Sequence, residues 1–368
     1  MHFVVFGLCV SSSWGNGHAT LWRGLLKALV RRGHTVTFYE KDVPYYASTR
    51  DGWQPPRGAT VVLYEHFSDV RAKAKCECDR ADVALFTSYC ADAHEASRML
   101  LDSAAAIKGF YDLDTPVTLE CLHSGTRVPY LPPDGLGEFD LVLSYTGGRA
   151  LAELQSLLGA RVVKPLYGWV DESTHRPSAP LDEFRSELCY LGTFARDRQE
   201  MLDELFLKTA KALPERRFAL AGAQYPDDFP WSQNIFFVRH LEPSLHPAFF
   251  CSSRATLNVT RAAMTQYGFC PSGRLFEAAA CGVPIVSDLW EGLETFFTPG
   301  QEILPAVCSA DVQAALGLSD YELKSIAAAA RDKVLTCHTA DTRVLELESI
   351  CEGVCGRTAQ PEMIAHAS

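Results

Sequence analysis

Glu277 is the residue whose surroundings most strongly indicate chemistry, because it is a lone carboxylate among small and apolar neighbours in residues 272–286, SGRLFEAAACGVPIV. The spacing of the apolar residues predicts an amphipathic helix that ends at Gly282, followed by a buried strand over 283–286. An ionised carboxylate in such surroundings requires a partner. A ligand hydroxyl would serve, and the alternative is an ion pair with Arg274, three residues earlier on the same helix face.

A second candidate is the loop Gly15-Asn16-Gly17-His18, between an apolar run over 3–10 and a predicted helix over 19–32. The glycines allow a ligand to approach the backbone and leave the helix N-terminus free to face an anion. His18 suits a general base or a hydrogen bond to a ligand hydroxyl. The alternative is a histidine that caps its own helix.

Two carboxylates, Asp112 and Asp114, end another apolar run and would lie on the same side of an extended backbone. Paired carboxylates suit general-base or hydroxyl-binding work, and equally a helix N-cap or a turn. We favour a site role, because the run ends at the carboxyl end of a predicted strand.

Arginines follow two strands of the second half of the chain. Arg196 and Arg198 come after Gly192-Thr193, and Arg261 comes after a strand over 255–258. Guanidinium groups match phosphate oxygens, whereas cations at a helix start are disfavoured unless an anion is near. The alternatives are solvated arginines and, for Arg261, an interdomain salt bridge.

The elements that must position these residues alternate between strands and helices, which predicts parallel sheets covered on both faces. Strands are expected at 36–39, 60–64, 83–87, 104–111 and 141–144, and again at 188–192, 217–221, 235–238 and 255–258. Helices are expected at 91–101, 149–158, 198–212 and 321–352.

The Pro-rich polar segment 171–180 is interpreted as a linker between an N-terminal domain, 1–170, and a C-terminal domain, 181–335. Residues 336–368 would form a helical segment and tail. Ligands are expected in a cleft facing the carboxyl ends of the strands.

Bulk composition agrees with a two-domain soluble protein, since 368 residues exceed the usual size of a single core and 47% are apolar. The net charge of 34 − 45 = −11 argues against a surface for bare nucleic acid. The odd number of scattered cysteines, 13, indicates a reduced, cytoplasmic chain. No apolar run approaches the ~20 residues of a membrane helix. No cysteine or histidine pair completes a zinc spacing with Cys76 and Cys78, so no metal site is expected.

The run from Pro271 through Ser272, Gly273, Arg274, Leu275 and Phe276 to Glu277, continuing as AAACGVPIV, resembles GT-B glycosyltransferases. Within them it is most similar to the CgeB-type, spore-maturation-type branch, with a donor motif of the retaining type. The resemblance implies an α/β GT-B fold, with two Rossmann-like doubly wound domains, an interdomain cleft and a C-terminal helix that crosses back. The chain departs from the broader retaining pattern at one position, because that pattern has a second Glu where Phe269 stands.

By this resemblance, a hexosyl unit would pass from a nucleoside diphosphate sugar to a hydroxyl acceptor without a metal or a separate cofactor. The expected catalytic residues are His18, Asp114 and Arg261. The expected donor-binding residues are Gly17, Gly192, Thr193, Arg196, Ser272, Arg274, Glu277 and Asp288. Glu277 would bind the donor ribose. The open alternatives are a nucleotide-sugar epimerase or hydrolase, a non-catalytic spore or coat scaffold, and a nucleic-acid acceptor. Base, sugar, stereochemistry and oligomeric state are not indicated.

Overall fold

The computed structural model describes residues 1–358, so the last ten residues of the predicted tail lie outside it. The chain divides into two units. The N-terminal unit contains Met1–Tyr167 and the chain from Asp341 onward, and the C-terminal unit contains Gly168–Ala340. The segment 171–180, interpreted above as a linker, therefore lies within the C-terminal unit.

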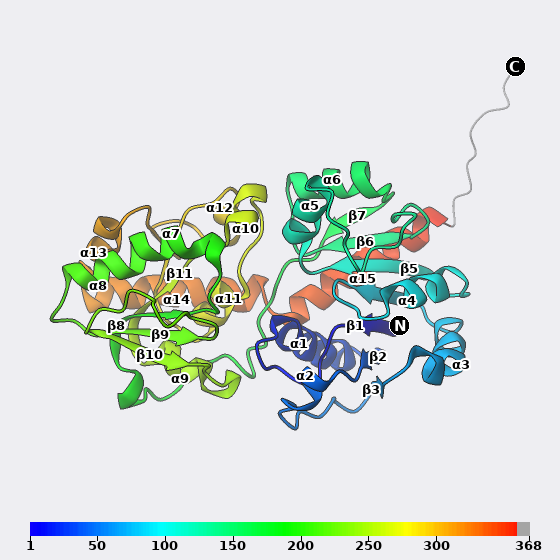
Figure 1. The fold of residues 1–368 in the computed structure, drawn as a ribbon, viewed down its shortest axis with the longest axis horizontal. Helices are drawn as coiled ribbons and strands as arrows, with labels where there is room; N and C mark the ends of the chain where they lie inside the picture. Colours follow the sequence, from blue (N-terminus) through cyan, green and yellow to red (C-terminus); the bar gives the residue numbers. More distant parts are fainter. Residues whose placement is uncertain (359–368) are drawn as a thin grey trace, which may run out of the picture. The chain divides into compact units, whose positions relative to one another are not determined.

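The N-terminal unit is built on a seven-stranded parallel sheet in the order β3-β2-β1-β4-β5-β6-β7 (Figure 1). Its strands are β1 (His2–Gly7), β2 (Thr35–Lys41), β3 (Ala59–Tyr64), β4 (Val83–Thr87), β5 (Ile107–Asp112), β6 (Leu141–Ser144) and β7 (Val163–Pro165). The strand order reverses between β1 and β4, and this switch point is where ligands bind in open α/β sheets. Because all pairs are parallel, the carboxyl ends of β1, β4 and β5 meet at one edge.

The helices of this unit are α1 (Gly17–Arg31), α2 (Pro44–Ala47), α3 (Phe67–Cys78), α4 (Ala93–Leu101), α5 (Thr115–His123) and α6 (Arg149–Leu158). Helix α1 buries Trp22, Leu25, Leu26 and Leu29, and the chain leaves it through Gly33 at φ +83°. Helix α3 was not predicted from the sequence, because its buried residues form only a narrow stripe over Phe67, Val70, Ala74 and Cys78.

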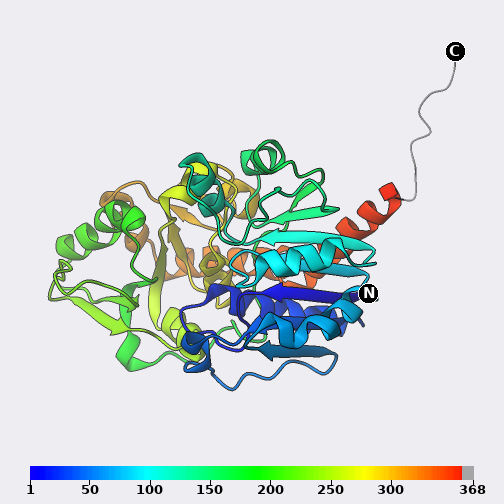
Figure 2. The ribbon, with the colours of Figure 1, turned by 45° about the vertical axis from the view of Figure 1, so that its right-hand side comes forward.

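The last helix, α15 (Ala340–Thr358), returns to the N-terminal unit, as predicted (red in Figure 2). Arg32 and His34 both bond to Glu348, at 2.6 Å each, and Arg31 bonds to Asp341 at 2.7 Å. The helix predicted over 321–352 is therefore two helices, α14 (Asp320–Cys337) and α15. The break at His338–Thr339 has a local cause, because Val170 exchanges backbone hydrogen bonds with His338 and Ala340 there.

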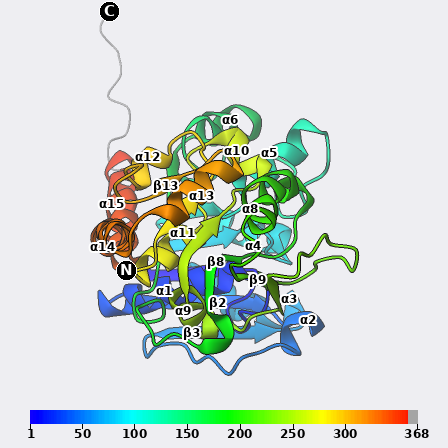
Figure 3. The same cartoon turned by 90° about the vertical axis from the view of Figure 1, so that its left-hand side faces the viewer.

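The C-terminal unit contains a six-stranded parallel sheet in the order β10-β9-β8-β11-β12-β13. Figure 3 labels β8, β9 and β13 of this sheet. Its strands are β8 (Ser186–Leu191), β9 (Phe218–Gly222), β10 (Ile235–Arg239), β11 (Ser253–Asn258), β12 (Ile285–Ser287) and β13 (Leu304–Pro305). Its α-helices are α7 (Gln199–Leu202), α8 (Lys208–Ala212), α9 (His246–Cys251), α10 (Ala262–Tyr267), α11 (Gly273–Ala280), α12 (Leu293–Phe296), α13 (Ser309–Gly317) and α14. A π-helical turn, Asp203–Leu207, interrupts the helix predicted over 198–212. None of the helices in residues 1–358 combines the length and apolar character needed to cross a membrane.

Candidate active site

The loop that follows β1 is held in place by Glu40, a fully buried carboxylate of β2. Glu40 accepts hydrogen bonds from the backbone N–H groups of Val10 and Ser11, at 2.7 and 2.9 Å, and from the Ser11 hydroxyl. A buried carboxylate is tolerated only with such partners, so the charge fixes the path of the loop. The same loop leads into α1 and places His18 at the carboxyl end of the strands.

His18 is the second residue of α1 and does not cap the helix. The N-cap is Asn16, whose side-chain oxygen accepts from Ala19 N at 3.4 Å. The His18 imidazole lies instead against Asp114, with 2.8 Å between Nε2 and Oδ2. The structure thus joins two residues that are 96 positions apart and that were both predicted to be catalytic.

Asp114 begins α5, yet its side chain makes no capping bond. Its Oδ2 atom accepts from Ser88 Oγ at 3.0 Å as well as facing His18. A carboxylate can only accept, so Nε2 donates to Asp114, and in a neutral imidazole the lone pair is then on Nδ1. That Nδ1 atom is buried and has no hydrogen-bond partner within residues 1–358. The arrangement is that of a histidine oriented by a carboxylate, with its basic nitrogen unused.

Asp112 has a different environment from Asp114, because the backbone does not stay extended between them. Asp112 ends β5 and is fully buried, with Oδ1 accepting from Asp114 N at 3.0 Å. Burial, together with the nearby Asp114 charge, raises the pKa of Asp112 to about 7. Much of Asp112 is therefore protonated at neutral pH, which leaves Asp114 as the charged partner of His18.

Tyr89 is a neighbour of this pair that the sequence analysis missed. It follows β4, has φ +58°, and is 43% exposed. Its ring lies 6.1 Å from that of His18 and 5.0 Å from that of Tyr130. A tyrosine rarely adopts a positive φ, so the surrounding structure constrains it. No sequence pattern signals this conformation.

In the C-terminal unit, Gly192 lies where β8 and β9 end close together. A Cβ atom at Gly222 would overlap the Gly192 carbonyl oxygen, and one at Gly192 would lie 2.6 Å from the Tyr190 hydroxyl. Tyr225 donates to that carbonyl at 3.0 Å. Close approach of the backbone therefore requires glycine at 222, whereas at Gly192 a larger residue would displace the Tyr190 side chain.

The two arginines after this strand have different surroundings. Arg196 is exposed at the start of a single 3-10 turn, Arg196–Arg198, and Thr193 before it is half-buried. Arg198 donates to the Tyr190 hydroxyl at 2.9 Å, and its buried Nε has no partner in the described part of the chain. Arg198 is thus a better-positioned guanidinium than the predicted Arg196 for an anion beside Gly192.

Arg261 contacts Asp197, with 3.0 Å between Nε and Oδ2. Both residues belong to the C-terminal unit, so this ion pair is not the interdomain bridge considered above. Asp288, a predicted donor-binding residue, is 4% exposed and accepts from Thr260 N and Oγ1, at 3.0 and 2.9 Å. Burial raises the pKa of Asp288 to about 6. Its oxygens orient the turn that carries Arg261, which favours a positioning role over contact with the donor.

Glu277 lies in the second turn of α11, after the N-cap residue Ser272, and within residues 1–358 its carboxylate lies near His175 and forms no ion pair with Arg274. The His175 Nε2 and Glu277 Oε2 atoms are 4.0 Å apart. His246, the first residue of α9, is the third member of this cluster. Burial lowers the pKa of His246 to about 4, against the opposing charge of Glu277, so its ring is neutral at pH 7. The sequence signalled neither histidine.

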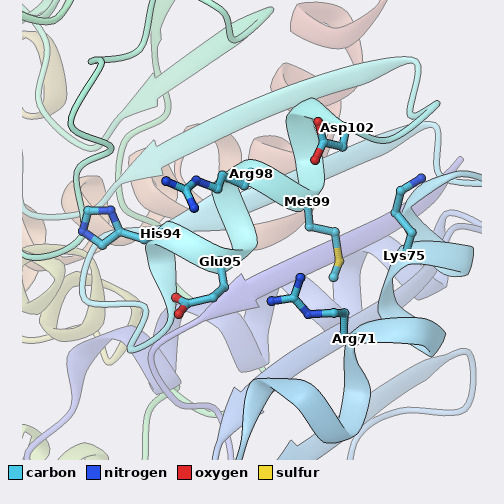
Figure 4. Close-up of a pocket in the computed structure, with 7 residues that line it drawn as sticks. All are labelled: Arg71, Lys75, His94, Glu95, Arg98, Met99 and Asp102. Carbon is cyan, nitrogen blue, oxygen red and sulfur yellow. The ribbon is translucent and has the colours of Figure 1, made fainter.

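A groove of about 490 Å³ lies elsewhere in the N-terminal unit, along α3 and α4 (Figure 4). It is lined by Arg71, Lys75, His94, Glu95, Arg98, Met99 and Asp102. Lys75 is already paired with Asp79 at 2.6 Å. None of the predicted site residues lines this groove, so its size does not make it the active site.

Comparison with known proteins identifies the architecture. Residues 196–349 match a family model described as glycosyl transferase-like. Sucrose-phosphate synthase from Thermosynechococcus elongatus has a similar structure, with a TM-score of 0.68 at 12% identity over 97% of this chain and 100% of that one. The chain has the GT-B fold.

Two further GT-B structures are similar over nearly their whole length. An alpha-glucosyltransferase in complex with UDP-glucose and DNA containing an abasic site has a TM-score of 0.68 at 12% identity, covering 96% of this chain and 99% of that one. Anabaena HepE in complex with UDP-glucose has a TM-score of 0.64 at 12% identity, covering 96% and 100%. None of the curated proteins matches the chain by sequence.

Within this GT-B fold, the predicted residues form groups at the carboxyl edges of the two sheets. His18 and Asp114 are in direct contact in the N-terminal unit. At Gly17, where α1 starts, a Cβ atom would meet nothing within 4 Å, so packing among the described residues does not require glycine there. In the C-terminal unit, Ser272 is the N-cap residue of α11, and Arg274 is half-buried in the first turn of that helix.

Proposed function

We propose that the protein is a glycosyltransferase that moves a glycosyl unit, a hexosyl by the family resemblance, from a nucleoside diphosphate sugar to a hydroxyl acceptor. The observation that carries the proposal is the 2.8 Å contact between His18 and Asp114 at the switch point of the N-terminal sheet. The GT-B fold and the glycosyl transferase-like match over 196–349 support it. Structural neighbours that bind UDP-glucose make a uridine nucleotide the first donor to test.

In the proposed reaction, the His18 imidazole takes the proton of the acceptor hydroxyl as its oxygen forms a bond to the anomeric carbon. The buried Nδ1 atom must become exposed for this transfer. The bond from that carbon to the diphosphate oxygen breaks, and the leaving group departs with the electron pair. Asp114 stabilises the imidazolium that forms, as carboxylates do for catalytic histidines. A single displacement of this kind inverts the anomeric centre, and it needs no carboxylate at the position of Phe269.

Negative charge grows on the departing diphosphate, and arginines are the groups proposed to stabilise it. Arg261 is held by Asp197 and by the Asp288–Thr260 turn, and Arg198 has an unused buried N–H beside Gly192. Charge stabilisation of this type accounts for several kcal/mol in enzymes generally. On this basis we propose a metal-independent reaction, in which activity persists in EDTA.

The test is a thermal-shift screen of UDP, ADP, GDP and dTDP sugars, followed by transfer assays with the labelled donor that binds. We expect sugar transfer to a hydroxyl acceptor, with an inverted product, and loss of transfer in His18→Ala. Turnover of the donor that needs no acceptor would instead identify a hydrolase or an epimerase. Binding of no nucleotide sugar would contradict the proposal and favour a scaffold.

A further inference from the structure

Three polar side chains converge in the C-terminal unit from separate parts of the chain. Glu277 comes from α11, His246 from the start of α9, and His175 from the loop that follows Asp171. One potential ligating atom of each lies within 4.8 Å of the other two. His175 is 2% exposed, and its Nε2 atom has no hydrogen-bond partner among residues 1–358. A buried polar atom without a partner is costly, so a ligand or a water must complete the cluster.

The backbone explains why His175 points into this cluster. Its N–H donates to the Asp171 carbonyl at 2.9 Å, and the Asp171 carboxylate accepts from Ser173 N at 3.0 Å. These bonds close a tight turn next to the Val170–Thr339 bridge. The imidazole is therefore held in place by its own loop, and Glu277 does not hold it.

The distances decide which ligand fits. A circle around three atoms within 4.8 Å of one another has a radius of at most 4.8/√3, or about 2.8 Å, which is the usual hydrogen-bond length to an oxygen. One oxygen atom can therefore reach all three side chains. A zinc ion about 2.1 Å from both His175 Nε2 and Glu277 Oε2, which are 4.0 Å apart, would need a ligand-metal-ligand angle of about 145°, far from tetrahedral. The cluster fits a hydroxyl better than a metal ion.

The charges of the cluster also favour a hydroxyl. An ionised Glu277 can only accept hydrogen bonds, whereas a hydroxyl carries one hydrogen to donate and two lone pairs to receive. His246 is neutral at pH 7 and forms no full ion pair with Glu277, because burial lowers its pKa to about 4. The Glu277 carboxylate can therefore accept a hydrogen bond that a ligand donates.

We propose that His175 and His246 act with Glu277 to bind a ribose hydroxyl of the donor nucleotide, and that the two histidines make the site selective for ribonucleotides over deoxyribonucleotides. This inference rests on the proposed function, since it takes the ligand to be a nucleoside diphosphate. Selectivity follows because a deoxyribose would leave His175 Nε2 and Glu277 without a partner in a largely buried site. Sites built to bond a hydroxyl strongly reject analogues that lack it.

Calorimetry with UDP, 2′-deoxy-UDP and 3′-deoxy-UDP tests the inference on the full chain, with the corresponding adenosine and guanosine diphosphates as further probes. For the base that binds, at least one deoxy analogue should bind on the order of 100-fold more weakly than the ribonucleotide. His175→Phe keeps the size and packing of the ring. It should weaken ribonucleotide binding to the level of the deoxy analogue and so remove the difference. His123→Ala, at an exposed histidine of the N-terminal unit, is the matched control and should behave as wild type.

The outcomes separate the two proposals. Equal binding of the ribonucleotide and both deoxy analogues would overturn the histidine inference and leave the nucleotide donor intact. Unchanged discrimination in both His175→Phe and His246→Asn, with melting temperatures like wild type, would overturn it as well. Stoichiometric Zn²⁺ binding that disappears in His175→Phe would assign the cluster to a metal instead. If none of the diphosphates binds, both the inference and the proposed function fail.

Discussion

The histidine sites of the two units differ in how fully their polar atoms are paired. In the N-terminal unit, His18 Nε2 contacts Asp114 at 2.8 Å, and Ser88 supports the same carboxylate oxygen. In the C-terminal unit, His175 Nε2 stays 4.0 Å from Glu277, beyond hydrogen-bond distance. His18 and Asp114 are therefore bonded to each other without a ligand, whereas the spacing of His175 and Glu277 allows both to bond to one ligand oxygen atom.

This difference matches the two proposed roles, which are a general base in the N-terminal unit and hydroxyl binding in the C-terminal unit. A general base must have its tautomer fixed in advance, which requires a short bond to a carboxylate. In a binding site for a hydroxyl, the side-chain donors and acceptors must instead lie too far apart to bond to one another, so that each can form its own hydrogen bond to the ligand oxygen. The buried atoms without a partner among residues 1–358 are His18 Nδ1 in the first site and His175 Nε2 in the second.

The largest effect is expected from Asp114→Asn, which keeps the shape of the side chain but removes its charge. The imidazole would lose its fixed tautomer, and kcat should fall about 1000-fold, within the range of general acid-base catalysis. UDP affinity should remain at the wild-type value, because the nucleotide is assigned to the other unit. Transfer assays and calorimetry on the same variant check both. A parallel loss of UDP binding would show that the two sites do not divide the work.

Asp112→Asn should change how stability depends on pH. The folded-state pKa of Asp112 is raised from 3.8 to about 7, so its stabilising contribution is complete below pH 4 and is lost as pH rises through 7. Between pH 5 and pH 9 this loss amounts to about 3 kcal/mol, and the variant should lack it. Urea unfolding of both proteins at the two pH values measures the difference. Equal slopes with pH would show that Asp112 is ionised throughout.

Arg261→Ala should weaken UDP binding about 30-fold, as expected for loss of a hydrogen bond between charged groups. Arg261→Lys should restore only part of the affinity, because an ammonium cannot form two parallel bonds to a phosphate. Asp197→Asn serves as the control for the ion pair at 3.0 Å. If it weakens binding as much as Arg261→Ala, Arg261 holds the loop and does not bind the phosphate.

Ser88→Ala should have the smallest effect of the four. Asp114 would lose a hydrogen bond of 3.0 Å but keep its contact with His18, so kcat should fall about 5-fold. A pH profile of kcat sharpens the test, since the profile should keep its shape when the carboxylate loses only one of its donors. A fall as large as that of Asp114→Asn would place Ser88 within the catalytic group.

Much of the fold could be predicted from the sequence because its strands are short apolar runs. Residues 83–87 and 141–144 were predicted with their observed bounds as β4 and β6, and α6 was predicted over 149–158. The crossing back of α15 followed from the family resemblance. The break between α14 and α15 was missed, because it depends on hydrogen bonds to Val170 that no local pattern encodes.

Candidate site residues could be predicted from the sequence where they directly follow a predicted strand or its loop, as His18 and Asp114 do. Their contact was not predictable, since it depends on β1 and β5 lying on either side of β4 in the sheet. His175 was missed for the opposite reason, because proline and polar residues around it made the segment resemble a linker. His246 belongs to no recognisable sequence motif, and it lies near Glu277 only in the folded protein.

The return of α15 to the N-terminal unit has a consequence for biosynthesis. The C-terminal unit is one continuous stretch of chain, so its fold needs no residue that is synthesised after Ala340. The N-terminal unit differs, because Arg32 and His34 bond to Glu348, which is synthesised after the whole of the C-terminal unit. The unit that is synthesised first is thus the last to complete its fold. A chain that is cut before Glu348 would lack the bonds from Arg32 and His34 to this residue.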